Sequence, residues 1–184
     1  GPKVLEHLVD VVLSFVGDRY GGFRIGRAQK NRYGSTNEAA IFEMSDEGLK
    51  IVDNPSASLL EERQNLDGSI VLATLEGARP LLVEIQALVN PTSFGYPKRT
   101  ASGFDLNRLN LLIAVLEKRT KLKLSDKDIF INVVGGLKLS DPAADLAVAM
   151  AIASASAGKK LSDEAVVFGE VGLGGEIRSA DQRG

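Results

Sequence analysis

The sequence predicts an α+β fold in which strands come first along the chain and helices later. Short β-branched, apolar segments fill the first half, and the helical spacing of apolar residues is confined to two segments of the second half. No repeating strand–helix–strand pattern is present, which disfavours a parallel α/β sheet. With 184 residues, the chain has the length of one ordinary domain or of one domain with an appendage.

The N-terminal third is predicted to hold a hairpin followed by two short strands. Residues 9–18 and 23–31 are the strands of the hairpin, and "DRYGG" supplies the turn between them. The segments "AIFEM" and "GLKIV" follow as two short strands around a turn at residues 45–48. Asn54 and Pro55 end the second of them.

The central part is predicted to contain a second hairpin and a long loop. Apolar residues dominate positions 69–89, with a loop at 76–80 between two strands. Residues 90–104, "NPTSFGYPKRTASGF", hold two prolines and two glycines, and a loop of this length inside a compact domain is usually functional or mobile. Further strands are predicted at 128–134 and at 165–178, the latter as two strands joined by a glycine turn.

Two helices are predicted in the second half. The first starts at the N-cap Asp105 and runs to about Thr120. Four apolar residues share its predicted buried face: Leu106, Leu109, Ile113 and Leu116. The second spans residues 141–158, "DPAADLAVAMAIASASAG", with Asp141 as N-cap and Gly158 closing its end. Its small residues would let another element pack very close.

The amino-acid composition argues against several classes of protein and of binding site. The net charge of −2 disfavours a strongly basic nucleic-acid binder, so any nucleic-acid contact would need a local basic patch. The absence of cysteine and the single histidine, His7, argue against disulfides and against a zinc cluster. No apolar run approaches the ~20 residues of a membrane helix, and no segment resembles a signal peptide, so we expect a cytoplasmic protein. Gly1 and Pro2 resemble the scar of a processing protease and are left out of fold reasoning.

Motifs of self-sufficient enzymes are absent from the chain. It has no GxxxxGK[ST] loop to hold phosphates, no HExxH zinc motif, no calcium loop and no GxSxG elbow. Carboxylates are plentiful, but none stands out as half of an acid/base pair. On residues alone, the chain is a poor candidate for an enzyme.

The segment "KNRYG", residues 30–34, carries the first notable pair of cations. Lys30 and Arg32 are two positions apart, so on a strand both side chains point to the same face. Two cations presented together suit a polyphosphate or a carboxylate. The alternative is a solvated edge strand that uses its charge to prevent aggregation.

A second group of cations surrounds the predicted loop at 90–104. It comprises five residues: Lys98, Arg99, Arg108, Arg79 and Lys138. Three aromatic residues are interleaved with them: Phe94, Tyr96 and Phe104. Such a surface resembles one that contacts backbone phosphates and stacks on bases. The alternative is ordinary solvated charge with the aromatic rings in the core.

Several separated motifs together resemble the bacterial RadA/Sms DNA-repair family, in the order in which the family carries them. They are "KNRYG", "STNEAAIFEMSDEGL", "NPS", "RPLLVEIQALV", "DLNRLNLLIAVLEKR", "FINVVGGLKLSDPAADLA" and "VVFGEVGLGGEIR". The resemblance covers residues 3–180. Tyr33 stands where the family usually has phenylalanine, which keeps the aromatic ring.

The resemblance implies a Lon-protease-like domain (ribosomal protein S5 domain 2-like) for residues 35–184, truncated at its C-terminus. Residues 3–34 would be the end of a RecA-like ATPase core, including the β-hairpin and the KNR-type motif. In active Lon proteases, a segment resembling "GPSAG" starts the second helix and its serine is the nucleophile. The equivalent segment here is "DPAAD" at 141–145, which places Ala143 at the serine position. Alanine has no hydroxyl group, so nucleophilic catalysis would be lost.

The resemblance also implies a function. Members of the family form hexameric rings that hydrolyse ATP, bind single-stranded or branched DNA and promote branch migration beside a RecA-type recombinase. Lys30 and Arg32 would reach the γ-phosphate bound by the next subunit, where a cation supplied in trans can be worth ~10³–10⁵ in rate. Lys98, Arg99 and Arg108, and then Arg79 and Lys138, would neutralise DNA phosphates.

Cofactors follow from the same resemblance. ATP and magnesium would act in the full-length protein, and zinc would sit in an N-terminal finger that this chain lacks. None is expected in the chain itself.

Two other functions stay open. The chain could be an active Ser–Lys peptidase of the Lon type, which Ala143 argues against; Ser140 is near the helix start but precedes it. It could also be a plain protein-interaction scaffold without DNA affinity. Likeness of fold alone does not decide among these functions.

Overall fold

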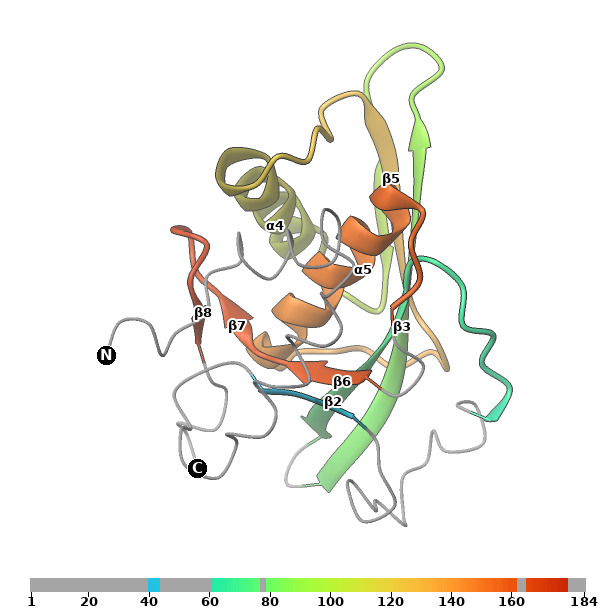
Figure 1. Cartoon of the computed structure of the whole chain (residues 1–184), viewed down its shortest axis with the longest axis vertical. Helices are drawn as coiled ribbons and strands as arrows, with labels where there is room; N and C mark the ends of the chain where they lie inside the picture. The colour runs from blue at the N-terminus through green and yellow to red at the C-terminus, as the bar shows by residue number, and fades with distance from the viewer. Residues whose placement is uncertain (1–39, 44–60, 77–78, 162–164, 179–184) are drawn as a thin grey trace.

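The computed structural model describes residues 40–43, 61–76, 79–161 and 165–178, and Figure 1 shows them as a curved sheet with helices packed against it. The predicted hairpin at 9–31, the strand "GLKIV" and the boundary between residues 34 and 35 lie outside these residues. No helix among the described residues is long and apolar enough to cross a membrane.

The sheet has six strands in the order β1-β6-β2-β3-β5-β4. The strands are β1 (Ala40–Glu43), β2 (Ser69–Glu76), β3 (Arg79–Pro91), β4 (Arg99–Ser102), β5 (Lys127–Val133) and β6 (Ala165–Phe168). The pairs β2/β6 and β4/β5 are parallel, and β1/β6, β2/β3 and β3/β5 are antiparallel. The sheet is therefore mixed, and the prediction of a mixed α and β fold is confirmed.

The hairpin β2–β3 forms the middle of the sheet, as predicted. Along β3, residues 81–85 are buried, whereas Gln86, Leu88 and Asn90 are exposed and alternate with buried or half-buried neighbours. This alternation is the period of two expected for a strand with one covered face. The 13-residue strand β3 extends beyond the start of β2 and pairs with β5 from Ile85 to Pro91, so it links the two halves of the sheet.

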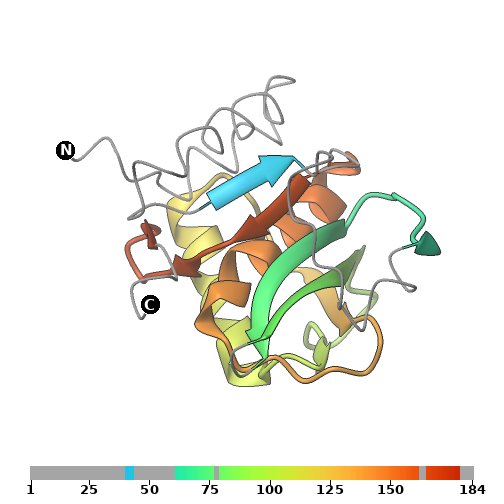
Figure 2. The ribbon, with the colours of Figure 1, turned by 90° about the horizontal axis from the view of Figure 1, so that it is seen from below.

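Two helices, α4 (Leu106–Arg119) and α5 (Asp145–Ala157), pack against the sheet, and a 3₁₀ turn η2 (Pro142–Ala144) leads into α5. Figure 2 shows the helices behind the strands of the sheet. Apolar side chains of both helices and of β2, β3 and β5 form one core. A separate two-stranded sheet, β7 (Glu170–Val171) and β8 (Ile177–Arg178), follows β6.

The alanine-rich helix α5 is the centre of the core. Residues 145–154 are all buried, so this helix has no solvent-facing side over most of its length. Its small side chains allow the backbone of the β2 start to approach closely. A Cβ atom added to Gly68 would lie 2.2 Å from the Ala87 carbonyl oxygen and 3.3 Å from the Ala155 Cβ. The Gly68 N–H donates to the Ser154 hydroxyl at 2.8 Å, which fixes this approach. The prediction that small residues permit close packing is confirmed.

Three predictions about local structure need correction. The long loop predicted at 90–104 is shorter, because β3 continues to Pro91 and residues 99–102 form β4, a parallel strand at the sheet edge. The helix α4 has the predicted caps, but Leu106 in its first turn is 45% exposed and lies off the buried face. The helix predicted from residue 142 begins with a 3₁₀ turn, so α5 proper starts at Asp145.

Candidate functional site

The start of α5, where the lost nucleophile was predicted, lies beside a cavity of about 290 Å³. Asp141 caps the 3₁₀ turn by accepting a hydrogen bond from the Ala143 N–H, at 3.0 Å from its Oδ1. Ala143 itself is 2% exposed, so its methyl group belongs to the core. The charged groups that line the cavity are Asp105, Asp141, Asp145, Glu170 and Arg108.

An ion pair between the buried Asp145 and the partly exposed Arg108 closes one wall of this cavity. Arg108 donates from Nε to Asp145 Oδ1 at 2.9 Å, and its Nη2 donates both to Asp145 Oδ2 and to the Val171 carbonyl at 3.1 Å. The Val171 N–H also donates to Asp145 Oδ2, at 3.0 Å. Asp145 is 1% exposed. Its hydrogen bond raises the pKa of Arg108, because the carboxylate stabilises the charged guanidinium.

The groups around this cavity join structural elements and do not form a serine–lysine pair. Among the described residues that line it, the hydroxyl is that of Ser140, and no lysine is present. Asp105 caps α4 by accepting a hydrogen bond from the Arg108 N–H at 2.9 Å. The ion pair connects the starts of α4 and α5 with β7. Arg108, predicted to bind DNA, thus has a carboxylate partner within the protein.

A second candidate site is the loop of residues 92–98, which joins β3 to β4. Its two ends are anchored on the same carboxylate, because the Thr92 hydroxyl and the Lys98 N–H both donate to Asp128 Oδ1, at 2.9 and 2.8 Å. The Thr92 N–H donates in addition to the Asp126 carbonyl at 2.9 Å. The hydrogen bond from Lys98, followed by that from Thr92, holds the pKa of Asp128 below its ordinary value.

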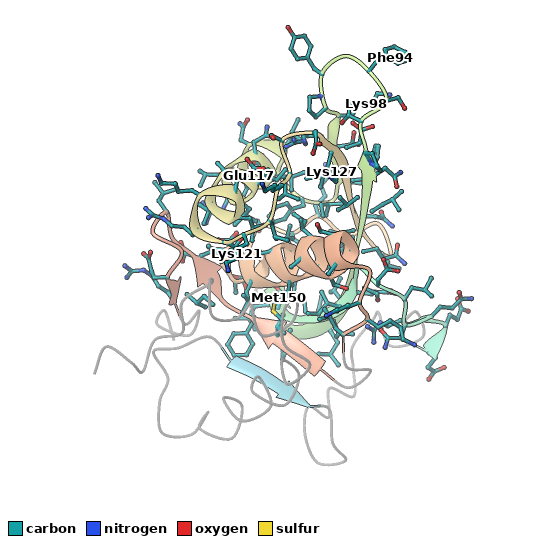
Figure 3. All side chains as sticks on the ribbon, turned by 45° about the horizontal axis from the view of Figure 1, so that its top comes forward. Phe94, Lys98, Glu117, Lys121, Lys127 and Met150 are labelled. Carbon is teal, nitrogen blue, oxygen red and sulfur yellow. The ribbon has the colours of Figure 1, made fainter. Side chains whose placement is uncertain are left out.

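The aromatic residues of this region divide between core and solvent. Phe94 and Tyr96 are 88% and 93% exposed, whereas Phe104 is 9% exposed and packs in the core. Figure 3 shows the Phe94 ring at the outer end of the loop, with Lys98 closer to the sheet. The prediction of three interleaved rings is therefore reduced to two rings at the loop tip.

Four cations lie near the base of this loop. Lys98 is exposed, and Arg99 donates from Nη2 to the Leu124 carbonyl at 2.9 Å. Lys127 pairs with Asp126 at 3.1 Å, and Lys123 is close enough to lower the pKa of Asp126 further. Lys123 is not among the cations that the sequence groups around the loop. The pairing of β5 with the end of β3 brings it there, and this pairing could not be derived from local pattern.

The other predicted DNA-binding residues lie toward the opposite end of the sheet. Arg79 begins β3, and a strand of 13 residues spans about 40 Å. Lys138 follows the far end of β5, and Arg108 is in the first turn of α4, which follows β4. The structure therefore brings Lys98 and Arg99 together and separates them from the other three. Contact of any of the five residues with DNA remains a prediction.

The remaining predicted site residues cannot be placed. Lys30 and Arg32, expected to act on the ATP of a neighbouring subunit, lie outside the described residues. Within the part of the chain that the structure describes, no group of histidine, cysteine or acidic residues has the arrangement of a metal site.

Comparison with known proteins reveals similarity along the whole chain. Proteins named DNA repair protein RadA are 52% identical in Aquifex aeolicus, 53% in Halalkalibacterium halodurans and 55% in Bacillus subtilis. The alignments cover 97%, 100% and 97% of this chain and 40%, 41% and 39% of those proteins. The chain thus spans about two fifths of the length of the curated relatives it matches. A family model described as subunit ChlI of Mg-chelatase matches residues 97–182.

Proposed function

Because the chain belongs to the RadA family of DNA repair proteins, we propose that it is the non-proteolytic, DNA-contacting part of a DNA repair ATPase. Its residues 35–184 would be a Lon-protease-like domain that serves as a scaffold for a hexameric ring. The full-length protein would act as an ATP-dependent helicase in branch migration beside a RecA-type recombinase. ATP with magnesium, and zinc, would be bound by parts of that protein outside this chain, with Lys30 and Arg32 reaching the neighbouring subunit's ATP.

The loss of proteolysis is supported by the start of α5. Ala143, which the resemblance to Lon proteases puts at the nucleophile position, has its methyl group buried in the core. The adjacent cavity lacks a lysine among its described lining residues, and its arginine is held by Asp145. A serine needs a neighbouring base to become nucleophilic, so Ser140 alone does not supply a peptidase mechanism.

The observation that carries the DNA-contacting role is the gathering of Lys98, Arg99, Lys123 and Lys127 around one exposed loop. The three acidic groups described nearby, Asp126, Asp128 and Glu117, are engaged in hydrogen bonds within the protein and leave the four cations in excess by one. The excess of positive charge at this end is available to backbone phosphates, although the chain as a whole is slightly acidic.

A salt series of fluorescence anisotropy with labelled single-stranded DNA tests this role. The variant Lys98→Glu/Lys123→Glu removes two cations from the loop base and leaves the hydrogen bond of Arg99 intact. The plot of log K against log salt concentration has a negative slope, and the loss of two phosphate contacts should make that slope less steep by about 1.4. The control Lys159→Glu/Lys160→Glu makes the same change in net charge after the end of α5 and should keep the slope.

The same samples distinguish the competing function. If a well-formed oligomer of the unmodified chain shows no salt-dependent DNA binding, the domain is a scaffold alone and the DNA-contacting role is wrong. Mass photometry of each sample supplies the oligomeric state, so that loss of DNA binding is not confused with loss of assembly.

A further inference from the structure

The tip of the 92–98 loop exposes two aromatic rings that have no role in folding. Phe94 and Tyr96 are the most exposed large apolar residues among those that the structure describes; the next, Leu173, is 67% exposed. Neither ring belongs to the core. Because exposing apolar rings to water is unfavourable, two of them at the end of one loop point to a ligand with a complementary surface.

The rings stand on a loop whose base is held in place. Asp128 accepts hydrogen bonds from both Thr92 and Lys98, and the Ile129 N–H donates to the Lys98 carbonyl at 2.9 Å. Gly95, between the two rings, has φ +80°, a conformation that other residues rarely adopt. The base of the loop is thus fixed before a ligand binds, which lowers the conformational entropy lost on binding, and Gly95 permits the turn between the rings.

The charges nearby indicate the chemistry of the ligand. Lys98 and Lys127 lie at the base of the loop and Phe94 lies at its outer end, as Figure 3 shows. Lys123 lies close enough to Asp126, whose carbonyl binds the Thr92 N–H, to lower the pKa of that carboxyl group. A cationic base beneath aromatic rings matches a polymer that has phosphates along its backbone and flat bases beside them. In a duplex the faces of the bases are covered by their stacked neighbours, whereas unpaired bases offer them to a side chain.

We propose that Phe94 and Tyr96 stack on unpaired bases and give this chain a preference for single-stranded over duplex DNA. The inference rests on the proposed DNA-contacting function. It adds to that function the residues that distinguish single-stranded from duplex DNA. The cations would attract the phosphates of either form of DNA, and the rings would discriminate between the two.

The test compares Phe94→Ala/Tyr96→Ala with the unmodified chain on a single-stranded oligonucleotide and on the same sequence as a duplex. Stacking on one base is worth roughly 5- to 150-fold in affinity, so the variant should lose at least tenfold on the single strand. Its duplex affinity should change less than twofold. A 2-aminopurine base in the strand should be quenched by the unmodified chain and not by the variant.

Two further variants provide controls for these changes. Tyr96→Phe keeps the aromatic face and should retain the preference for single strands. Leu173→Ala removes an exposed apolar side chain between β7 and β8 and should change neither affinity. Because both rings are exposed, thermal unfolding of all variants should match that of the unmodified chain.

The outcomes separate this inference from the function on which it rests. Unchanged or equally reduced affinity for both forms of DNA overturns base stacking, while continued sensitivity to Lys98→Glu/Lys123→Glu keeps the DNA-contacting role. Loss of self-association in Phe94→Ala/Tyr96→Ala would instead assign the rings to a subunit interface and also overturn the inference. Failure of the unmodified chain to bind either DNA overturns both proposals.

Discussion

The two ends of the sheet use their polar groups in opposite ways. At the start of α5, Asp145, Arg108 and Asp141 are joined to each other or to the main chain, and Ala143, predicted to stand at a nucleophile position, is in the core. At the 92–98 loop, hydrogen bonds hold only the base of the loop, and the side chains of Phe94 and Lys98 extend into solvent.

This difference indicates which end of the domain has side chains available to bind a ligand. The first end has a cavity, yet the one cation among its described lining residues, Arg108, is paired with Asp145, and this pair connects α4, α5 and β7. The second end has no such internal use for its rings and for Lys98. Substitutions at the first end should therefore change stability, and those at the second end should change binding.

The largest effect is expected for Asp145→Ala. Removal of this carboxylate leaves the N–H of Val171 without its partner and the guanidinium of Arg108, whose side chain is 30% exposed, without its counter-charge. Breaking a buried pair from one side costs about 3–5 kcal/mol of the free energy of unfolding, and the partial exposure of Arg108 favours the lower end of that range. Urea denaturation followed by circular dichroism measures it.

The control for this prediction is Asp126, which lies beside the 92–98 loop. Its pair with Lys127 is exposed, with Asp126 at 78% exposure, so Asp126→Ala should leave the unfolding midpoint unchanged. Equal loss of stability in the two variants would contradict the contrast between the two ends.

The second prediction compares two glycines with positive φ. Gly103 has φ +87°, and a Cβ there would lie 2.5 Å from the Leu137 carbonyl oxygen and 2.7 Å from the Val133 Cβ. Gly103→Ala should therefore cost about 2–4 kcal/mol, from backbone strain and overpacking together. Gly95 has φ +80° with open space around it, so Gly95→Ala should cost only the strain, about 1 kcal/mol.

Chemical denaturation of both glycine variants gives this difference directly. A cost at Gly95 as large as that at Gly103 would show that the loop tip is packed in solution. DNA affinity of Gly95→Ala should also fall, because the angle between the two rings depends on that turn.

Most of the fold could be predicted because its local patterns are strong. The alternation in residues 69–89, the cap at Asp105 and the small residues of 141–158 each specify an element through nearby residues alone. The strand β4 was missed since "RTAS" has no apolar alternation of its own. It becomes a strand by pairing with β5, a contact between distant parts of the chain.

The sequence indicates which residues belong to the candidate sites, but it does not indicate which of them contact one another. Lys98, Phe94 and Tyr96 stand out in the sequence because they are close together in it. The partner of Arg108 is Asp145, 37 positions away, and no local pattern indicates that pair.

The third prediction concerns Ala143→Ser, which returns a hydroxyl to the nucleophile position. We expect no labelling by a fluorophosphonate probe, because the adjacent cavity has no lysine or histidine among its described lining residues to act as a base. Stability should fall by about 1–3 kcal/mol, because the added hydroxyl group would be buried in the core. The unmodified chain should also remain unlabelled. Labelling that disappears in Ser140→Ala would mean that a peptidase centre is present after all.

The smallest effect is a pH dependence confined to the loop. Hydrogen bonds from Lys98 and Thr92 hold the pKa of Asp128 below its ordinary value of 3.8, whereas the unfolded chain keeps that ordinary value. The anchor is therefore complete above the unfolded pKa and is lost as the pH falls through the lower, folded pKa.

Nuclear magnetic resonance shifts of the Lys98 and Gly95 amides should follow this titration below pH 3.8, with the core unchanged. Asp128→Asn keeps a carbonyl acceptor for the Lys98 N–H and removes the charge, so its loop should lack the titration and retain its conformation at neutral pH. If those amides titrate equally in Asp128→Asn, the loop is anchored by another group, and the contrast between its fixed base and its free rings loses its physical basis.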